Sequence, residues 1–120
     1  MKVNLIKRQT IEDYAIYKPG SKSPFEEWLS KLKYADWNSP EDIKATFGSA
    51  DLLGKGSNRV VFDIGGNNYR MICKYMFGKK EVHLFICWIG SHSEYDKLTG
   101  TKKNKKKRSQ DPDQYTIKLY

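Results

Sequence analysis

The stretch that decides the fold is residues 59–90, RVVFDIGGNNYRMICKYMFGKKEVHLFICWIG. Apolar and polar side chains alternate through it, and turn-forming residues interrupt the alternation at Gly65-Gly66 and at Gly78-Lys79. Segments of period two that are separated by glycine-containing turns are typical of β-hairpins. The sequence therefore predicts two successive antiparallel hairpins, with strands at 59–64, 67–76 and 81–90.

The turns predict the register of these strands. A two-residue turn at Gly65-Gly66 places Arg59 opposite Ile72, and the second turn places Cys87 opposite Arg70. Opposed residues share a sheet face. One face is then apolar and is expected to meet helices: Val60, Phe62, Ile64, Tyr69, Met71, Cys73, Tyr75, Val82, Leu84, Ile86 and Trp88. The other face is mixed and basic: Arg59, Val61, Asp63, Asn68, Arg70, Ile72, Lys74, His83, Phe85 and Cys87.

Helices are predicted ahead of this sheet. Thr10 is expected to cap a short helix that ends at Lys18-Pro19-Gly20. Ser23 is expected to cap a second helix, with Pro24 at its first position and Glu26 completing a capping box. The apolar stripe of the second helix has the spacing of one helical face: Phe25, Trp28, Leu29 and Leu32.

The remaining elements are short. We predict a first strand at Lys2 to Ile6, and a third helix that starts after Ser39-Pro40 and ends near Gly48. Residues 49–58 are predicted to form a loop. A basic loop at about 101–110 and a final strand at about 115–120 complete a single domain of 120 residues.

Composition restricts the setting of the protein. The formal charge is +8, and the run Lys102, Lys103, Lys105, Lys106, Lys107 and Arg108 supplies six positive charges, so the rest of the chain carries only +2. Such a run either attracts polyanions or is a solvated linker. The two cysteines form no framework, which favours a reducing, intracellular setting. No apolar run approaches the ~18 residues of a membrane span, and the N-terminus is too short for a signal peptide.

The basic face suits the cleavage of RNA without a metal ion. The ribose 2′-OH can attack the adjacent phosphate if a protein removes its proton, protonates the leaving oxygen and stabilises the phosphorane. Arg70 can bind two phosphate oxygens, and Lys74 is a second cation on that face. Histidine is the side-chain type suited to exchanging a proton near neutral pH, which makes His92 a candidate base or acid. A turn or short helix would place Tyr95 on the same side.

Other interpretations remain open at this stage. Gly54-Lys55-Gly56 lacks the spacing of a phosphate-binding P-loop. Cys73, Cys87, His83 and His92 lack any recognised zinc-ligand spacing. A histidine at the end of a strand is more often structural than catalytic.

Several motifs resemble one known family. Residues 59–70 (RVVFDIGGNNYR) and 90–97 (GSHSEYDK) resemble the HigB toxin family of the RelE-like superfamily, and so do Ala35-Asp36-Trp37, Ser39-Pro40 and Asp42-Ile43-Lys44, in the same order. The resemblance covers roughly residues 1–98.

The resemblance implies a fold and a function. The fold is a compact α+β RelE-like fold, in which an N-terminal strand and helices pack on one face of a twisted, mainly antiparallel sheet. The function is that of a cytoplasmic, ribosome-dependent mRNA endoribonuclease, the toxin of a type II toxin–antitoxin system. Its partners are mRNA, the A site of the 30S ribosomal subunit and a helix-turn-helix antitoxin of the HigA type, with no metal, cofactor or membrane.

Site residues follow from the same resemblance. The catalytic candidates are Arg70, His92 and Tyr95, and the RNA-binding candidates are Lys55, Arg59, Asn67 and Lys74. Many relatives carry arginine where this chain has Cys87, which removes a cation from the basic face. A catalytically silent RNA-binding or partner-binding module and a gyrase-inhibiting toxin are therefore kept as alternatives.

Overall fold

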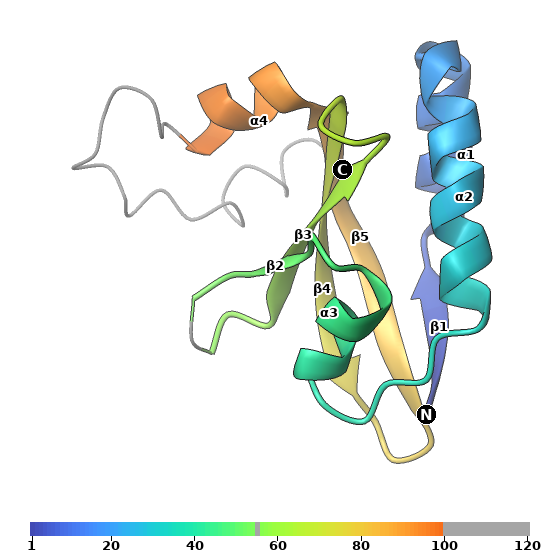
Figure 1. Ribbon diagram of the computed structural model, residues 1–120, viewed down its shortest axis with the longest axis vertical. Helices are drawn as coiled ribbons and strands as arrows, with labels where there is room; N and C mark the ends of the chain where they lie inside the picture. Colours follow the sequence, from blue (N-terminus) through green and yellow to red (C-terminus); the bar gives the residue numbers. More distant parts are fainter. Residues whose placement is uncertain (55, 100–120) are drawn as a thin grey trace.

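The protein is described by a computed structural model that covers residues 1–54 and 56–99. Four helices and five strands follow one another along the described chain (Figure 1). Their bounds are β1 (Lys2–Ile6), α1 (Arg8–Tyr17), the 3₁₀ turn η1 (Pro19–Ser21), α2 (Lys22–Lys33), α3 (Glu41–Thr46), β2 (Asp51–Leu52), β3 (Arg59–Ile64), β4 (Tyr69–Phe77), β5 (Glu81–Ser91) and α4 (His92–Thr99).

The strands form one mixed sheet in the order β1-β5-β4-β3-β2. β1 runs parallel to the first half of β5, and every other pair is antiparallel. Figure 1 shows α1 and α2 side by side along one face of this sheet, while α4 projects from the opposite side. The predicted α+β class, with helices packed on one face of a mainly antiparallel sheet, is confirmed.

The helix-side core is built on the predicted stripe of α2. Phe25, Trp28 and Leu32 are buried, and Leu29 is partly buried against them. The Trp28 ring stacks on Phe47 with centroids 5.2 Å apart and meets the edge of the Phe62 ring at the same distance. One indole therefore joins α2, the segment after α3 and strand β3.

The predicted starts of the first two helices are wrong. α1 begins at Arg8, so Thr10 lies inside its first turn. α2 begins at Lys22 as a continuation of η1, which places Ser23 and Pro24 inside the helix without any side-chain cap. The third helix is found where the sequence placed it, between Ser39-Pro40 and Gly48. The predicted loop at 49–58 contains the two-residue strand β2.

The first hairpin has a four-residue loop instead of a two-residue turn. Gly65 and Gly66 both adopt positive φ, of 66° and 70°, and the Asn68 N–H donates to the Gly65 carbonyl at 3.3 Å. Ile64 therefore pairs with Tyr69, and the register is displaced by two residues from the prediction. Because a displacement of two keeps every side chain on its face, the predicted faces of β3 and β4 hold while the predicted partners do not.

The second hairpin contains a β-bulge. Cys73 pairs with Ile86 but Ile72 pairs with Trp88, so Cys87 is an extra residue in β5. An extra, unpaired residue in a strand moves the side chains that follow it to the opposite face of the sheet. Trp88, predicted for the helix side, therefore lies on the other face. The residue opposite Arg70 is Gly90, and the predicted Cys87–Arg70 pairing is wrong.

A second, smaller apolar cluster results on that other face. Val61, Ile72, Trp88 and Tyr95 are all buried there, and Leu53, Cys87 and Leu98 pack against them. Tyr95 comes from α4, so this cluster seats α4 on the sheet. None of the described helices is long and apolar enough to cross a membrane. The predicted basic loop and final strand lie outside the described residues.

Gly90 is expected to be indispensable for this packing. A Cβ at Gly90 would lie 2.4 and 2.5 Å from two ring carbons of Trp88 and 2.9 Å from Oε1 of Glu94. Gly90→Ala should therefore lower the free energy of unfolding by about 1–3 kcal/mol, as overpacking does, measured by urea denaturation. Gly48→Ala is the matched control, since a Cβ there meets nothing within 4 Å. Equal stability of the two variants would contradict the described position of Trp88.

Candidate nucleic-acid interface

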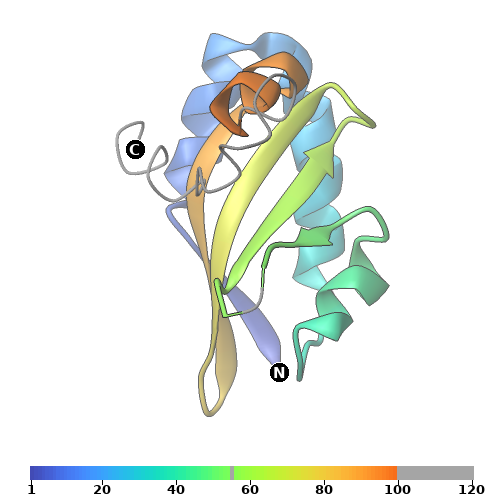
Figure 2. The same ribbon diagram turned by 90° about the vertical axis from the view of Figure 1, so that its left-hand side faces the viewer.

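The sheet surface opposite α1 and α2 is called here the open face, and Figure 2 looks onto it. The observed register arranges its side chains in cross-strand rows. From the end nearest α4, the rows are Asp63, Arg70 and Gly90; then Val61, Ile72 and Trp88; then Arg59, Lys74 and Phe85; then Met76, His83 and Asn4. We call the first the upper row and the third the basic row. An apolar row separates them.

Arg70 is held by two contacts in the upper row. Its Nε lies 3.0 Å from Oδ1 of Asp63, although the N–H does not point closely enough at that oxygen to form a hydrogen bond. Its guanidinium carbon lies 4.9 Å from the centroid of the Tyr95 ring, a cation–π distance. The Arg70 side chain is 22% exposed. The guanidinium is therefore oriented in advance, and part of its charge is compensated.

The start of α4 is fixed by a capping box. The Ser91 N–H donates to Oε1 of Glu94 at 2.8 Å, and the Glu94 N–H donates to Oγ of Ser91 at 3.1 Å. This reciprocal pair satisfies two donors at the helix N-terminus. The His92 N–H also donates to the Asn68 carbonyl at 3.1 Å. These bonds place His92 at the end of the sheet, beside the β3–β4 loop.

His92 has an oriented imidazole. Its Nδ1 lies 3.4 Å from Oδ2 of Asp96, one helical turn further along α4. The carboxylate favours the proton on Nδ1 and so leaves Nε2 as the nitrogen that can accept one. The His92 side chain is 35% exposed, enough for a ligand to reach it. Asp96 was not predicted as a site residue, although a carboxylate four residues after a helical histidine could have indicated it.

Tyr95 is a buried phenol surrounded by charge. Burial raises the pKa of Tyr95 above its usual value; Arg70 opposes this rise, and Asp51, Asp96 and Asp63 add to it. The phenol is therefore protonated at neutral pH and can donate a hydrogen bond, but it cannot act as a base. The ring packs on Trp88 with centroids 6.1 Å apart.

Two of the predicted RNA-binding residues, Arg59 and Lys74, lie apart from this group. Arg59 and Lys74 face each other in the basic row, and Nη1 of Arg59 donates to the Ser57 carbonyl at 3.0 Å. Lys74 is four residues from Arg70 on one strand, about 13 Å at the rise of a β-strand. Asn67 is exposed in the β3–β4 loop, and Lys55 lies outside the described residues.

The cysteines do not form a metal site. Cys73 is buried in the helix-side core, while Cys87 packs against the cluster on the open face. Burial raises the pKa of the Cys73 thiol well above its usual value, and Cys87 adds to the rise. Within residues 1–54 and 56–99, no three His, Cys, Asp or Glu side chains are grouped so that they could hold a metal ion.

Comparison with known proteins identifies the family of this chain. The family model of the HigB toxin, described as the RelE-like toxic component of a toxin–antitoxin system, matches residues 21–98. The chain belongs to the HigB toxin family. The matched residues run from the end of η1 to Leu98 of α4, so they include the described site and every open-face residue named above except Asn4 of β1.

Two curated relatives resemble this HigB-family chain. The mRNA interferase HigB of Escherichia coli O6:H1 (strain CFT073) is 34% identical over 93 residues, which cover 66% of this chain and 88% of the relative. The mRNA interferase toxin HigB of Escherichia coli K12 is 26% identical over 106 residues, which cover 88% of this chain and all of the relative. The resemblance inferred from the sequence motifs is thereby confirmed, and the fold described above is consistent with a RelE-like fold.

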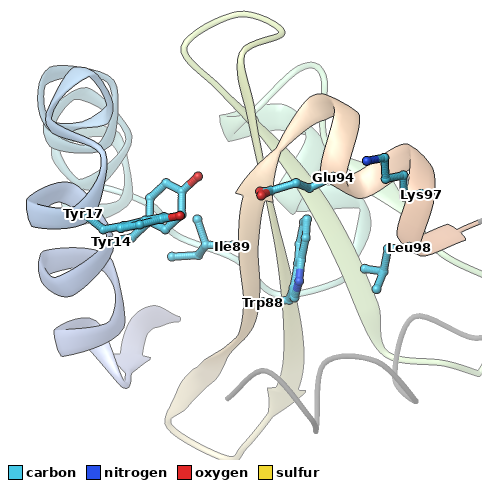
Figure 3. Close-up of a pocket in the computed structure, with 7 residues that line it drawn as sticks. All are labelled: Tyr14, Tyr17, Trp88, Ile89, Glu94, Lys97 and Leu98. Atoms are coloured by element: carbon cyan, nitrogen blue, oxygen red, sulfur yellow. The ribbon is translucent and has the colours of Figure 1, made fainter.

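A hollow on the HigB-family chain lies away from the predicted site residues. It measures about 470 Å³ and lies between α1 and α4, beside the part of β5 that extends past β1 (Figure 3). Its lining is mainly apolar: Tyr14, Tyr17, Trp88, Ile89, Glu94, Lys97 and Leu98. No predicted catalytic or RNA-binding residue lines it, so the open face remains the candidate site.

The buried phenols and thiol should make stability fall in alkali. The pKa values of Cys73, Tyr75 and Tyr95 are all raised in the folded protein. Above about pH 9 the unfolded chain loses these protons while the folded chain keeps them, so the free energy of unfolding decreases as pH rises. Tyr95→Phe should make this decrease shallower, as measured by urea denaturation between pH 8 and pH 11. Tyr34→Phe, which removes an exposed phenol, is the control, and an unchanged slope in Tyr95→Phe would contradict the burial of Tyr95.

Proposed function

We propose that this protein is an mRNA endoribonuclease that acts on mRNA held in the ribosomal A site. The relatives named mRNA interferases support the reaction class. The observation that carries the proposal is the arrangement at α4. An oriented imidazole, His92, and a protonated phenol, Tyr95, lie on one helix turn, and the phenol contacts the guanidinium of Arg70.

These groups suit a cleavage in which the RNA supplies its own nucleophile. Nε2 of His92 accepts the proton of the ribose 2′-OH as the 2′-oxygen bonds to the adjacent phosphorus. The bond from phosphorus to the 5′-oxygen then breaks, that oxygen takes up a proton from water, and His92 returns its proton to water. The products are a 2′,3′-cyclic phosphate and a free 5′-OH. No metal ion is required for this sequence of steps.

Arg70 and Tyr95 act on the charge that develops during this reaction. The guanidinium, oriented by Asp63 and by the Tyr95 ring, stabilises the negative oxygens of the phosphorane. The Tyr95 phenol donates a hydrogen bond to the same phosphate, because its raised pKa keeps the proton in place. Asp96 positions His92 and does not meet the RNA.

The partners and setting follow from the family. We propose that a helix-turn-helix antitoxin of the HigA type neutralises this toxin, and that the toxin acts in the cytoplasm. The basic run at 102–108 lies outside the described residues, and we propose that it adds salt-dependent contacts to ribosomal RNA.

A second candidate function is binding of RNA without cleavage. Asp63 compensates the charge of Arg70, and Cys87 adds no cation to the open face. Both features weaken the stabilisation of a phosphorane, and both leave RNA binding through the basic row intact. Cleavage assays therefore have to accompany binding assays.

Arg70→Ala should abolish cleavage without unfolding the protein. The variant removes the guanidinium from the upper row and leaves the helix-side core untouched. The measurement is cleavage of a defined mRNA by purified protein with and without programmed ribosomes, with circular dichroism as the test of folding. Arg8→Ala is the matched control, because Arg8 is also paired with a carboxylate, Glu12, but lies on α1.

Each result separates the candidates. Cleavage that requires ribosomes and is lost only in Arg70→Ala supports the proposed function. Ribosome binding with intact mRNA in the wild type would favour the binding module. A wild type that neither binds ribosomes nor cleaves mRNA, but inhibits gyrase, would favour the gyrase-inhibiting alternative. Full cleavage by a folded Arg70→Ala variant would reject the described site.

His92→Gln should lower the rate of the chemical step by about 10²–10⁴-fold, the usual contribution of a general acid or base. Single-turnover cleavage on ribosomes measures this step apart from binding. Lys97→Gln, which changes an exposed charge on the same helix, should leave the rate nearly unchanged. A rate for His92→Gln within threefold of wild type would show that another group handles the proton.

A further inference from the structure

The basic row lies on the open face but outside the group formed by Arg70, His92 and Tyr95. Arg59, Lys74 and Phe85 stand next to one another across β3, β4 and β5. Like charges placed directly opposite each other destabilise a sheet, so the Arg59–Lys74 pair favours the binding of an anion between the two cations.

Charge is distributed unevenly over the open face. Three carboxylates lie near Tyr95, and their negative charge offsets the positive charge of Arg70 in the upper row: Asp51, Asp63 and Asp96. Lys74 forms no ion pair with any carboxylate in the part of the chain that the structure describes. The electrostatic attraction of a phosphate to this face is therefore strongest in the basic row, about 13 Å from Arg70.

Phe85 adds an aromatic surface to the same row. Its side chain is partly exposed, and its neighbours in the sheet are Lys74 on one side and Ile6 on the other. Figure 2 shows that α4 crosses the upper end of the face, and no other described element crosses the lower strands on this side. Aromatic rings on a sheet face with cations beside them are one arrangement by which proteins bind single-stranded RNA.

We infer that Phe85 stacks on a base of the RNA, one or more nucleotides away from the cleaved phosphate, while Lys74 and Arg59 bind the phosphate of that same nucleotide. This inference rests on the proposed function for the identity of the ligand, and it adds a binding residue that the sequence analysis did not select. Because every base has a face that can stack, the subsite accepts any base.

The test uses the full-length protein and an oligoribonucleotide with 2′-O-methyl groups, which cannot be cleaved by 2′-OH attack. Fluorescence anisotropy at one fixed salt concentration gives Kd. Phe85→Leu keeps an apolar side chain but removes the ring, and it should weaken binding between about fivefold and a hundredfold. Phe85→Trp should bind at least as tightly as wild type. Phe85→Leu should weaken the binding of adenine-rich and of uracil-rich oligonucleotides to a similar degree.

The control variant is Tyr34→Leu. Tyr34 is an aromatic side chain, 79% exposed, with Nζ of Lys33 lying 5.6 Å from its ring centroid, but it lies at the end of α2. This variant removes the same kind of aromatic–cation pair from another surface, and its Kd should match that of wild type. Thermal unfolding of each variant shows whether it is folded.

Salt dependence separates the two roles within the subsite. Lys74→Gln should reduce the slope of log Kd against log salt by about one, whereas Phe85→Leu should leave the slope unchanged. The double variant should lose less affinity than the two single losses combined, because both side chains hold one nucleotide.

Three results would overturn the inference: no binding of the oligonucleotide by wild type, wild-type affinity in a folded Phe85→Leu variant, or equal losses in Phe85→Leu and Tyr34→Leu. Its failure is distinguishable from failure of the proposed function. A protein that cleaves mRNA but binds equally well with and without the Phe85 ring keeps its function and lacks this subsite. A protein that loses affinity in Phe85→Leu but never cleaves mRNA has the subsite and lacks the activity.

Discussion

The site depends on one extra residue in β5. The bulge at Cys87 turns Trp88 away from the helices and onto the open face, where it joins Val61 and Ile72 as an apolar seat. Tyr95 packs on that seat and brings α4 with it. Without the bulge, Trp88 would enter the helix-side core, and the apolar surface that α4 covers would lose its largest side chain. The position of His92 relative to Arg70 is therefore set by the backbone of a strand that contributes neither residue.

Periodicity predicts the two faces of β3 and β4 correctly, because a register error of two residues leaves every side chain on its face. The first hairpin was misplaced by two residues, yet Arg59, Arg70 and Lys74 kept their face, since two is the period of a strand. The bulge could not be placed from alternation alone, because Val82, Leu84, Ile86 and Trp88 alternate without a break. The run Ile86-Cys87-Trp88-Ile89 is uniformly apolar, however, and that run was the available signal that this strand is buried on both sides.

The chemistry of the site is less predictable from the sequence, because it depends on contacts between pairs of side chains. Arg70, His92 and Tyr95 could be selected by residue type and by resemblance. Their partners, Asp63 and Asp96, depend on the true loop length of the first hairpin and on where α4 begins. Helix starts were predicted poorly for the same reason: η1 runs directly into α2, so Ser23 never becomes a cap. Single residues can be recognised in a sequence, whereas the contacts that tune them need the register.

The parallel pairing of β1 with β5 has a consequence for synthesis of the chain. Lys2 pairs with Glu81 and Ile6 with Phe85, so the first strand to be made pairs with the last strand of the described residues. Contacts of such long sequence separation form late, because closing a long loop costs entropy before any contact is gained. While it is being translated, the nascent chain must carry β1 and the apolar stripe of α2 without their sheet. The N-terminal half therefore exposes its apolar side chains for longer than the rest of the growing polypeptide, and the open face is completed only when nearly all of residues 1–99 have been made.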